Sequence, residues 1–135
     1  MPNNTDFTRQ VQLLSDTVLY PDAVEFWKDQ LPPDNNQLTG LQYYSQDINQ
    51  LQSYVRHQKG RDWGKKEHYK NFYVKLDKTI DGLKKKAKQE FNLIPTGLTA
   101  AQEKKISDPI YSALVREFVQ HLVAHGQYML EQQRR

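Results

Sequence analysis

The chain has 135 residues, of which 37% are hydrophobic and 11% aromatic, and its formal net charge is +3. This length fits one domain, residues 1–135, with a single modest core. Cysteine is absent, which excludes disulfides, thiolate nucleophiles and cysteine-ligated zinc. The polar N-terminus lacks the apolar stretch of a secretory signal, and no run approaches about 18 apolar residues. We therefore expect a cytoplasmic protein that does not span a membrane, with flexible ends at residues 1–5 and 132–135.

Helical periodicity begins close to the N-terminus. The first apolar residues recur every three or four positions: Phe7, Val11, Leu14 and Val18. This spacing predicts an amphipathic helix over residues 6–20, which Pro21 is expected to end. A capping-box pattern at Asp22 predicts a short further turn of helix through Trp27. Residues 31–36 contain two consecutive prolines and predict the next break.

Two longer amphipathic helices are expected in the middle of the chain. The first has an apolar stripe made by Leu41, Tyr44, Ile48, Leu51 and Val55. A glycine-containing loop over residues 59–64 follows it. The second stripe, expected to mark the longest helix, consists of Tyr69, Phe72, Tyr73, Leu76, Ile80, Leu83, Ala87 and Phe91. Residues 95–97, with one proline and one glycine, are expected to end this region.

The C-terminal region predicts two more helices. Thr99 and Gln102 form a second capping-box pattern, which predicts the start of a short helix. Asp108 precedes Pro109, a residue suited to the first helical position, so a separate last helix is expected there. Its apolar stripe contains Ile110, Leu114, Phe118, Leu122 and Met129. Because no segment alternates with period two, the sequence predicts an all-α fold, an irregular bundle of about five to six helices with largely antiparallel neighbours.

Positive charge is concentrated in residues 56–88, which hold twelve lysines and arginines but only four acidic residues. Four lysines are expected to form a solvent-facing ladder away from the apolar stripe: Lys75, Lys78, Lys85 and Lys86. Cations at such spacing neutralise phosphates, and an exposed indole can stack on an unpaired base. The candidate nucleic-acid-binding residues are Arg56, Lys59, Arg61, Trp63, Lys65, Lys66, Lys70, Lys78, Lys85 and Lys86. The sequence thus predicts salt-dependent, sequence-tolerant binding to RNA or single-stranded DNA.

The basic region is open to more than one interpretation. It also fits an ordinary solvated helix face with a tryptophan covering the core, or a protein–protein adaptor or inhibitor with an acidic partner. A basic amphipathic helix can also lie on anionic lipid. The aromatic stripe is needed for the core, however, because burying each large side chain contributes about 1.5–3 kcal/mol. No membrane partner is therefore expected.

Residues with catalytic or metal-binding chemistry are few and scattered. Glu117, His121 and His125 share one helix face, but the outer two lie about 12 Å apart along the axis, so they do not converge on one ion. We expect no metal and place these residues at a partner interface. His57 with Asp62 is a conceivable nuclease pair. No nucleophile elbow or phosphate-cradling glycine loop occurs, so neither an enzyme nor a cofactor is expected.

Several short motifs follow one another in a distinctive order. They are Leu31-Pro32, Thr39-Gly40-Leu41 with Tyr43-Tyr44, the Tyr69 to Leu76 helix, and a late helix with Tyr111, Leu114, Glu117 and Leu122. Over most of the chain this order resembles the small helical subunit of type III CRISPR effector complexes, particularly the type III-B form. Thr39 stands where the family pattern has asparagine, and residues 58–63 have no clear counterpart.

The resemblance implies an all-helical, non-catalytic subunit of a ribonucleoprotein. Such subunits stack on one another and on other protein subunits, and their basic residues line the path of the guide–target duplex. Only the general basic character carries over to this chain, because the family motif supplies no individual site residue. The expected function is therefore a nucleic-acid-binding structural subunit of a larger assembly in antiviral defence.

Overall fold

The computed structural model describes the backbone of residues 4–134 and the side chains of residues 8–134. Its elements are α1 (Asn4–Leu14), the π-helical segment η1 (Ser15–Leu19), α2 (Tyr20–Phe26), α3 (Asn35–Tyr44), α4 (Ile48–Lys59), α5 (Glu67–Gln89) and α6 (Ala100–Gln133). No strand occurs within the described residues, so the predicted all-α bundle is confirmed. Of the ends expected to be flexible, residues 1–3 and 135 lie outside the described part, whereas residues 4–5 and 132–133 belong to α1 and α6.

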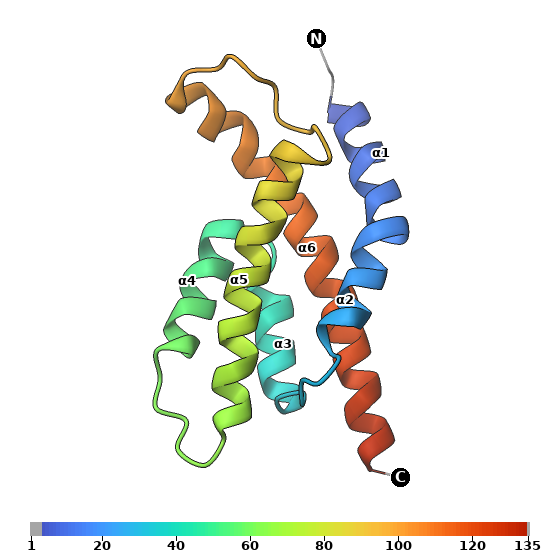
Figure 1. Ribbon diagram of the computed structural model, residues 1–135, viewed down its shortest axis with the longest axis vertical. Coiled ribbons are helices and arrows are strands. Elements are labelled where there is room, and N and C mark those ends of the chain that lie inside the picture. The colour runs from blue at the N-terminus through green and yellow to red at the C-terminus, as the bar shows by residue number, and fades with distance from the viewer. Residues whose placement is uncertain (1–3, 135) are drawn as a thin grey trace.

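Helix α6 runs the length of the molecule, with α3, α4 and α5 on one side of it and α1 and α2 on the other (Figure 1). At 34 residues it is longer than α5, which has 23 and was expected to be the longest. The core between these layers is apolar and aromatic. Its largest fully buried side chains include Leu19, Leu41, Phe72, Tyr73 and Phe118. Burial of this interior is the main stabilising contribution to the fold.

The first helical run continues through Pro21, contrary to the expected break. In η1 the Tyr20 N–H bonds the Ser15 carbonyl, five residues earlier. A proline ring clashes with the carbonyl four residues before it and offers no N–H. The wider π turn immediately before Pro21 accommodates that ring, so α2 follows without an interruption.

The helix expected from Leu41 to Val55 is in fact two helices. The Asp47 side chain accepts hydrogen bonds from the backbone N–H groups of Asn49, at 2.7 Å, and Gln50, at 3.3 Å, and thereby caps the start of α4. The prediction was wrong here because apolar residues lie four positions apart across the break, and this spacing imitates one continuous stripe.

Helix α6 begins as predicted and then continues where a break was expected. The Thr99 hydroxyl accepts from Gln102 N at 3.2 Å and the Gln102 side chain accepts from Thr99 N at 3.1 Å, which completes the capping box. The predicted separate start at Pro109 is wrong, because this proline lies inside α6. An interior proline costs about 3 kcal/mol, and the long buried stripe that includes Leu114 offsets that cost.

Candidate nucleic-acid interface

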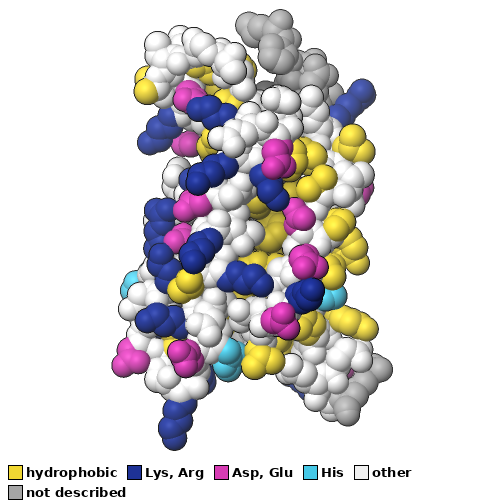
Figure 2. All heavy atoms as spheres, in the orientation of Figure 1, with side chains coloured by type: hydrophobic (Ala, Val, Ile, Leu, Met, Phe, Trp, Pro, Cys, Tyr) yellow, Lys and Arg dark blue, Asp and Glu magenta, His cyan; other side chains and the backbone are white. Residues whose placement is uncertain are grey.

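Lysine and arginine side chains run from the loop between α4 and α5 along the outer side of α5, with acidic side chains among them (Figure 2). Six of the predicted cations are exposed and have no carboxylate within 4.0 Å among the described side chains. We call this set the basic band: Arg61, Lys65, Lys66, Lys70, Lys78 and Lys85. Three of the six, Arg61, Lys65 and Lys66, belong to the segment between α4 and α5, and the other three belong to α5 itself.

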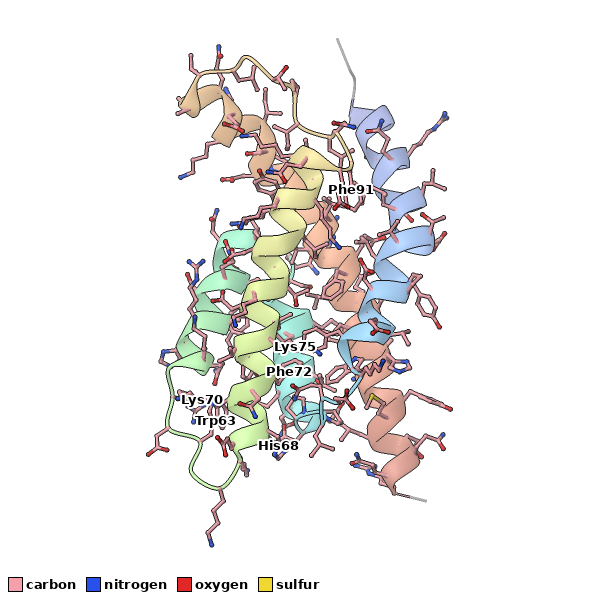
Figure 3. The ribbon with its side chains drawn as sticks, viewed as in Figure 1. Trp63, His68, Lys70, Phe72, Lys75 and Phe91 are labelled. Carbon is pink, nitrogen blue, oxygen red and sulfur yellow. The ribbon has the colours of Figure 1, made fainter. Side chains whose placement is uncertain are left out.

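Helix geometry sets the spacing within the basic band. Lys78 and Lys85 lie seven positions apart on the same face of α5, which corresponds to about 10 Å along the axis. Lys70 lies about two turns closer to the loop than Lys78, in the first turn of α5 (Figure 3). In the loop, the Arg61 guanidinium lies 4.6 Å from the Trp63 ring centroid, and Lys66 Nζ lies 5.3 Å from that of Tyr69. Ring contacts thus hold part of the loop's charge close to α5.

Two of the predicted phosphate contacts form ion pairs between helices α4 and α5. Lys59 Nζ lies 2.7 Å from Asp77 Oδ2, and Arg56 Nε lies 3.4 Å from Asp77 Oδ1. Arg56 also reaches Asp81 at 3.9 Å. The Asp77 side chain is only 11% exposed, so its charge needs these partners. Arg56 and Lys59 therefore hold α4 against α5, although Arg56 remains half exposed.

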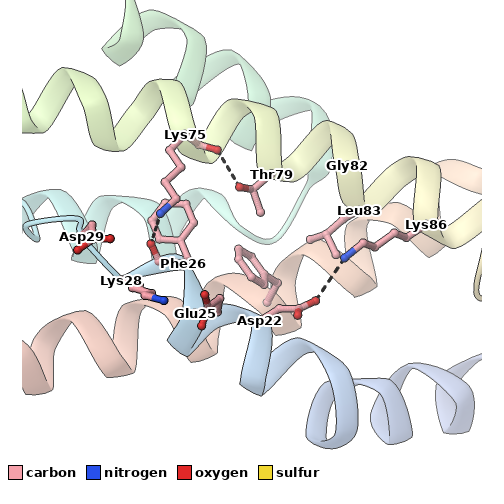
Figure 4. A pocket seen from close by; sticks show the side chains of 11 residues that line it. Asp22, Glu25, Phe26, Lys28, Asp29, Lys75, Thr79, Gly82, Leu83 and Lys86 are labelled. Carbon is pink, nitrogen blue, oxygen red and sulfur yellow. Dashed lines mark hydrogen bonds and ion pairs between the residues drawn. The ribbon is translucent and has the colours of Figure 1, made fainter.

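Two lysines of the expected solvent-facing ladder instead line a groove of about 590 Å³ between α2 and α5 (Figure 4). Lys75 donates to the Phe26 carbonyl at the end of α2 and lies 4.7 Å from the Phe26 ring centroid. Lys86 pairs with Asp22 at 3.5 Å. The ladder prediction is wrong for Lys75 and Lys86, because both side chains reach across the groove to α2, where Lys75 meets the last carbonyl and Lys86 meets a carboxylate. Lys78 and Lys85 are exposed, as expected.

Trp63, the expected stacking platform, is half-buried in an aromatic cluster. Its Nε1 donates to the Gln58 carbonyl at 2.8 Å, and its ring lies 5.2 Å from that of Tyr69 and 6.0 Å from that of Tyr73. Burial raises the pKa of the Tyr73 phenol, which stays neutral in this cluster. The indole therefore anchors the α4–α5 loop to α5 and supports the cations that the loop carries.

A second groove, between α3 and α4, was missed at the level of the sequence. Its volume is about 490 Å³, and its lining residues are Tyr44, Asn49, Gln50, Ser53, Tyr54 and His57. The only signal in the sequence is the adjacent pair Tyr43-Tyr44, which the apolar stripe accounted for only in part. His57 belongs to this groove, whereas Asp62, its conceivable nuclease partner, accepts a hydrogen bond from Gly64 N within the loop.

Two of the three residues considered for metal binding contact the N-terminal helical run of the same chain. His121 Nε2 lies 2.8 Å from Ser15 Oγ, and the Glu117 side chain accepts from Gln12 at 3.0 Å. His125 packs beside Tyr128. The Ser15–His121 pair was not foreseen, because it depends on the π turn of η1. Ser15 is 3% exposed, so this hydroxyl contributes to helix packing. No cluster of three or more metal-ligating side chains occurs among the described residues.

Comparisons with protein-family models, with curated proteins and with solved structures each found no match for this chain. The resemblance to type III CRISPR small subunits therefore rests on the short motifs alone. Within the described residues, none of the helices combines the length and the apolar character required to cross a bilayer.

Proposed function

We propose that this protein is a non-catalytic, nucleic-acid-binding structural subunit of a larger assembly, and that its ligand is RNA or single-stranded DNA. The observation that carries the proposal is the basic band, whose six exposed cations have no carboxylate partner among the described side chains. Cations at fixed positions neutralise backbone phosphates and release condensed counterions, which favours binding.

Ion pairs next to the basic band favour this function, because they fix α4, α5 and the loop between them relative to one another. Asp77 joins Arg56 and Lys59 across α4 and α5, and Trp63 anchors the loop between them. The cations of the loop and of α5 therefore keep their relative positions when a strand binds. Six phosphate contacts to a single strand predict a slope of about −4 in a plot of log K against log salt concentration.

Charge reversal within the basic band tests this proposal. The variant carrying Arg61→Glu, Lys65→Glu and Lys66→Glu is expected to lose at least about tenfold in affinity for a labelled single strand of about 16 nucleotides. The matched control reverses three exposed cations elsewhere on the chain: Arg9, Lys104 and Lys105. Both variants have the same net charge, so fluorescence anisotropy separates a local surface from a general charge effect.

Two outcomes would overturn the proposal. Unchanged affinity of the band variant would show that these cations do not contact the strand. An equal loss in both variants would show that only overall charge matters. Competition with poly-glutamate tests the alternative function, an adaptor or inhibitor that binds an acidic protein. If poly-glutamate displaces the strand when both are at the same concentration, the alternative is favoured.

The specific assembly proposed from the motif order is a type III CRISPR effector complex. The motif order is the support for this more specific proposal. Co-elution of the protein with type III backbone subunits and a guide RNA in size-exclusion chromatography would support it. Failure to co-elute, while single-strand binding persists, would overturn this assembly and leave the general function.

A further inference from the structure

The groove between α3 and α4 has an aromatic wall that is held in a fixed orientation. The ring of Tyr44, which lines the groove, stacks on that of Tyr54, with centroids 4.6 Å apart and an angle of 22° between the planes. Tyr54 in turn meets the edge of the buried Tyr73 ring at 6.2 Å. The Tyr44 ring is therefore positioned before any ligand arrives, so a ligand that packs against it costs little side-chain entropy.

The absence of a side chain at Gly40 leaves room for the Tyr54 ring beside Tyr44. A Cβ at position 40 would lie 2.8 Å from the Tyr54 hydroxyl oxygen, so a larger residue would push the ring out of its place. Next to the groove, Tyr43 meets Tyr44 edge to face at 5.0 Å and is 75% exposed. Tyr44 packs partly against the core, whereas Tyr43 does not, so the exposed ring area of this pair exceeds what core packing explains.

The other residues that line the groove are polar, and they carry no charge when the histidine is neutral. They are the exposed side chains of α4 around Tyr54, namely Asn49, Gln50, Ser53 and His57. None of these four side chains has a hydrogen-bond partner among the described residues. Amide and hydroxyl groups offer both donors and acceptors, which matches the mixed donor and acceptor pattern on the edge of an unpaired base.

The groove also adjoins the region of the basic band. His57 in the groove is the direct neighbour of Arg56, which faces α5, and α4 leads directly into the loop that carries Arg61. Only the width of α4, about 10–12 Å with side chains, separates the groove from the side of α5. A strand with its phosphates on the basic band is thus close enough to place a base in the groove.

We propose that the α3–α4 groove binds an unpaired nucleobase of the single strand, with the base stacked on the Tyr43-Tyr44 side and its edge toward Asn49 and Ser53. This inference rests on the proposed function and adds a site for the base to a site for the phosphates. It also assigns the stacking platform to these tyrosines in place of the half-buried Trp63. Such recognition tolerates different bases, because every base has an aromatic face.

Comparison of a normal strand with an abasic strand of equal length and charge tests the inference. The wild-type protein is expected to bind the normal strand about tenfold more tightly, since base stacking on an aromatic side chain has effects of this size. Tyr44→Ala is expected to remove this preference and to leave affinity for the abasic strand unchanged, which also reports that the domain is folded. The matched control is Tyr128→Ala, which removes an exposed tyrosine of α6 and should keep the preference.

A second variant keeps the test decisive if Tyr44→Ala unfolds the domain. Asn49→Ala combined with Ser53→Ala changes only exposed side chains and is expected to reduce the preference at least about threefold. Equal binding of the normal and abasic strands by the wild type would overturn the inference while leaving the basic band in place. Absence of binding to both strands would overturn the proposed function itself.

Discussion

Gly126 of α6 lies directly against the indole of Trp27. A Cβ on Gly126 would come within 2.7 Å of Trp27 Cζ2 and 3.1 Å of Leu38 Cδ1. The indole has little freedom to move away, because its Nε1 donates to the Leu122 carbonyl at 3.0 Å and its ring stacks on Phe72 with centroids 5.4 Å apart. Glycine at position 126 therefore permits the close approach of α6 to the end of α2.

Two glycine substitutions are expected to change stability in opposite directions. Gly126→Ala should lower the free energy of unfolding by about 1–3 kcal/mol, because overpacking outweighs the better helix propensity of alanine. Gly82→Ala in α5 should raise it by up to about 1 kcal/mol, since a Cβ there meets no atom within 4 Å. Urea unfolding of the two variants checks this pair, and a shift of both in the same direction would contradict the packing described.

Asp77→Asn is expected to lower stability and to raise affinity for nucleic acid at the same time. The change leaves Arg56 and Lys59 without their shared carboxylate, which is 11% exposed, and should cost about 1–2 kcal/mol. The two released cations become available to phosphates. Asp22→Asn is the control, because the more exposed pair with Lys86 should contribute less than about 1 kcal/mol. Chemical unfolding and anisotropy titrations measure both effects, and a loss of affinity in Asp77→Asn would contradict the prediction.

Stability is expected to fall above about pH 10, where free tyrosine ionises. Burial raises the pKa of Tyr73, and burial together with Asp34 raises that of Tyr69, so the folded state keeps protons that the unfolded chain releases. The stabilisation is complete below about pH 10 and decreases by about 1.4 kcal/mol per pH unit for each such group as pH rises. Tyr73→Phe should remove the contribution of one tyrosine to the slope of the unfolding free energy against pH. Unfolding free energies between pH 9 and 11 measure it, and an unchanged slope would show that Tyr73 ionises normally in the folded state.

Apolar spacing predicted the fold class and helix α5, but not where several helices begin and end. Pro21 and Pro109 both lie inside continuous helical runs, because a π turn or a long buried stripe offsets their local cost. The opposite error occurred at Asp47, where one continuous helix was predicted but this residue caps the start of a new helix, α4. Local residue signals and tertiary burial compete with similar energies, so a single sequence does not determine which prevails.

The same limit applies to the candidate site. The sequence located the concentration of cations, since charge counts do not depend on the fold. It did not show that Arg56 and Lys59 share Asp77, because that pairing follows from the packing of α4 on α5. Lys75 was placed in solvent because helical spacing alone does not reveal that the end of α2 lies within reach of its ammonium group. The tyrosine groove likewise exists only once Gly40 and Tyr54 meet.

The π turn of η1 also sets the rotation of α1 about its axis relative to α2. One additional residue in that turn rotates everything before it by about 100° relative to an uninterrupted α-helix. Removing a single residue between positions 15 and 19 would therefore swing Val11, which is buried, toward the solvent side. The number of residues in this turn therefore determines which face the N-terminal helix presents to α6.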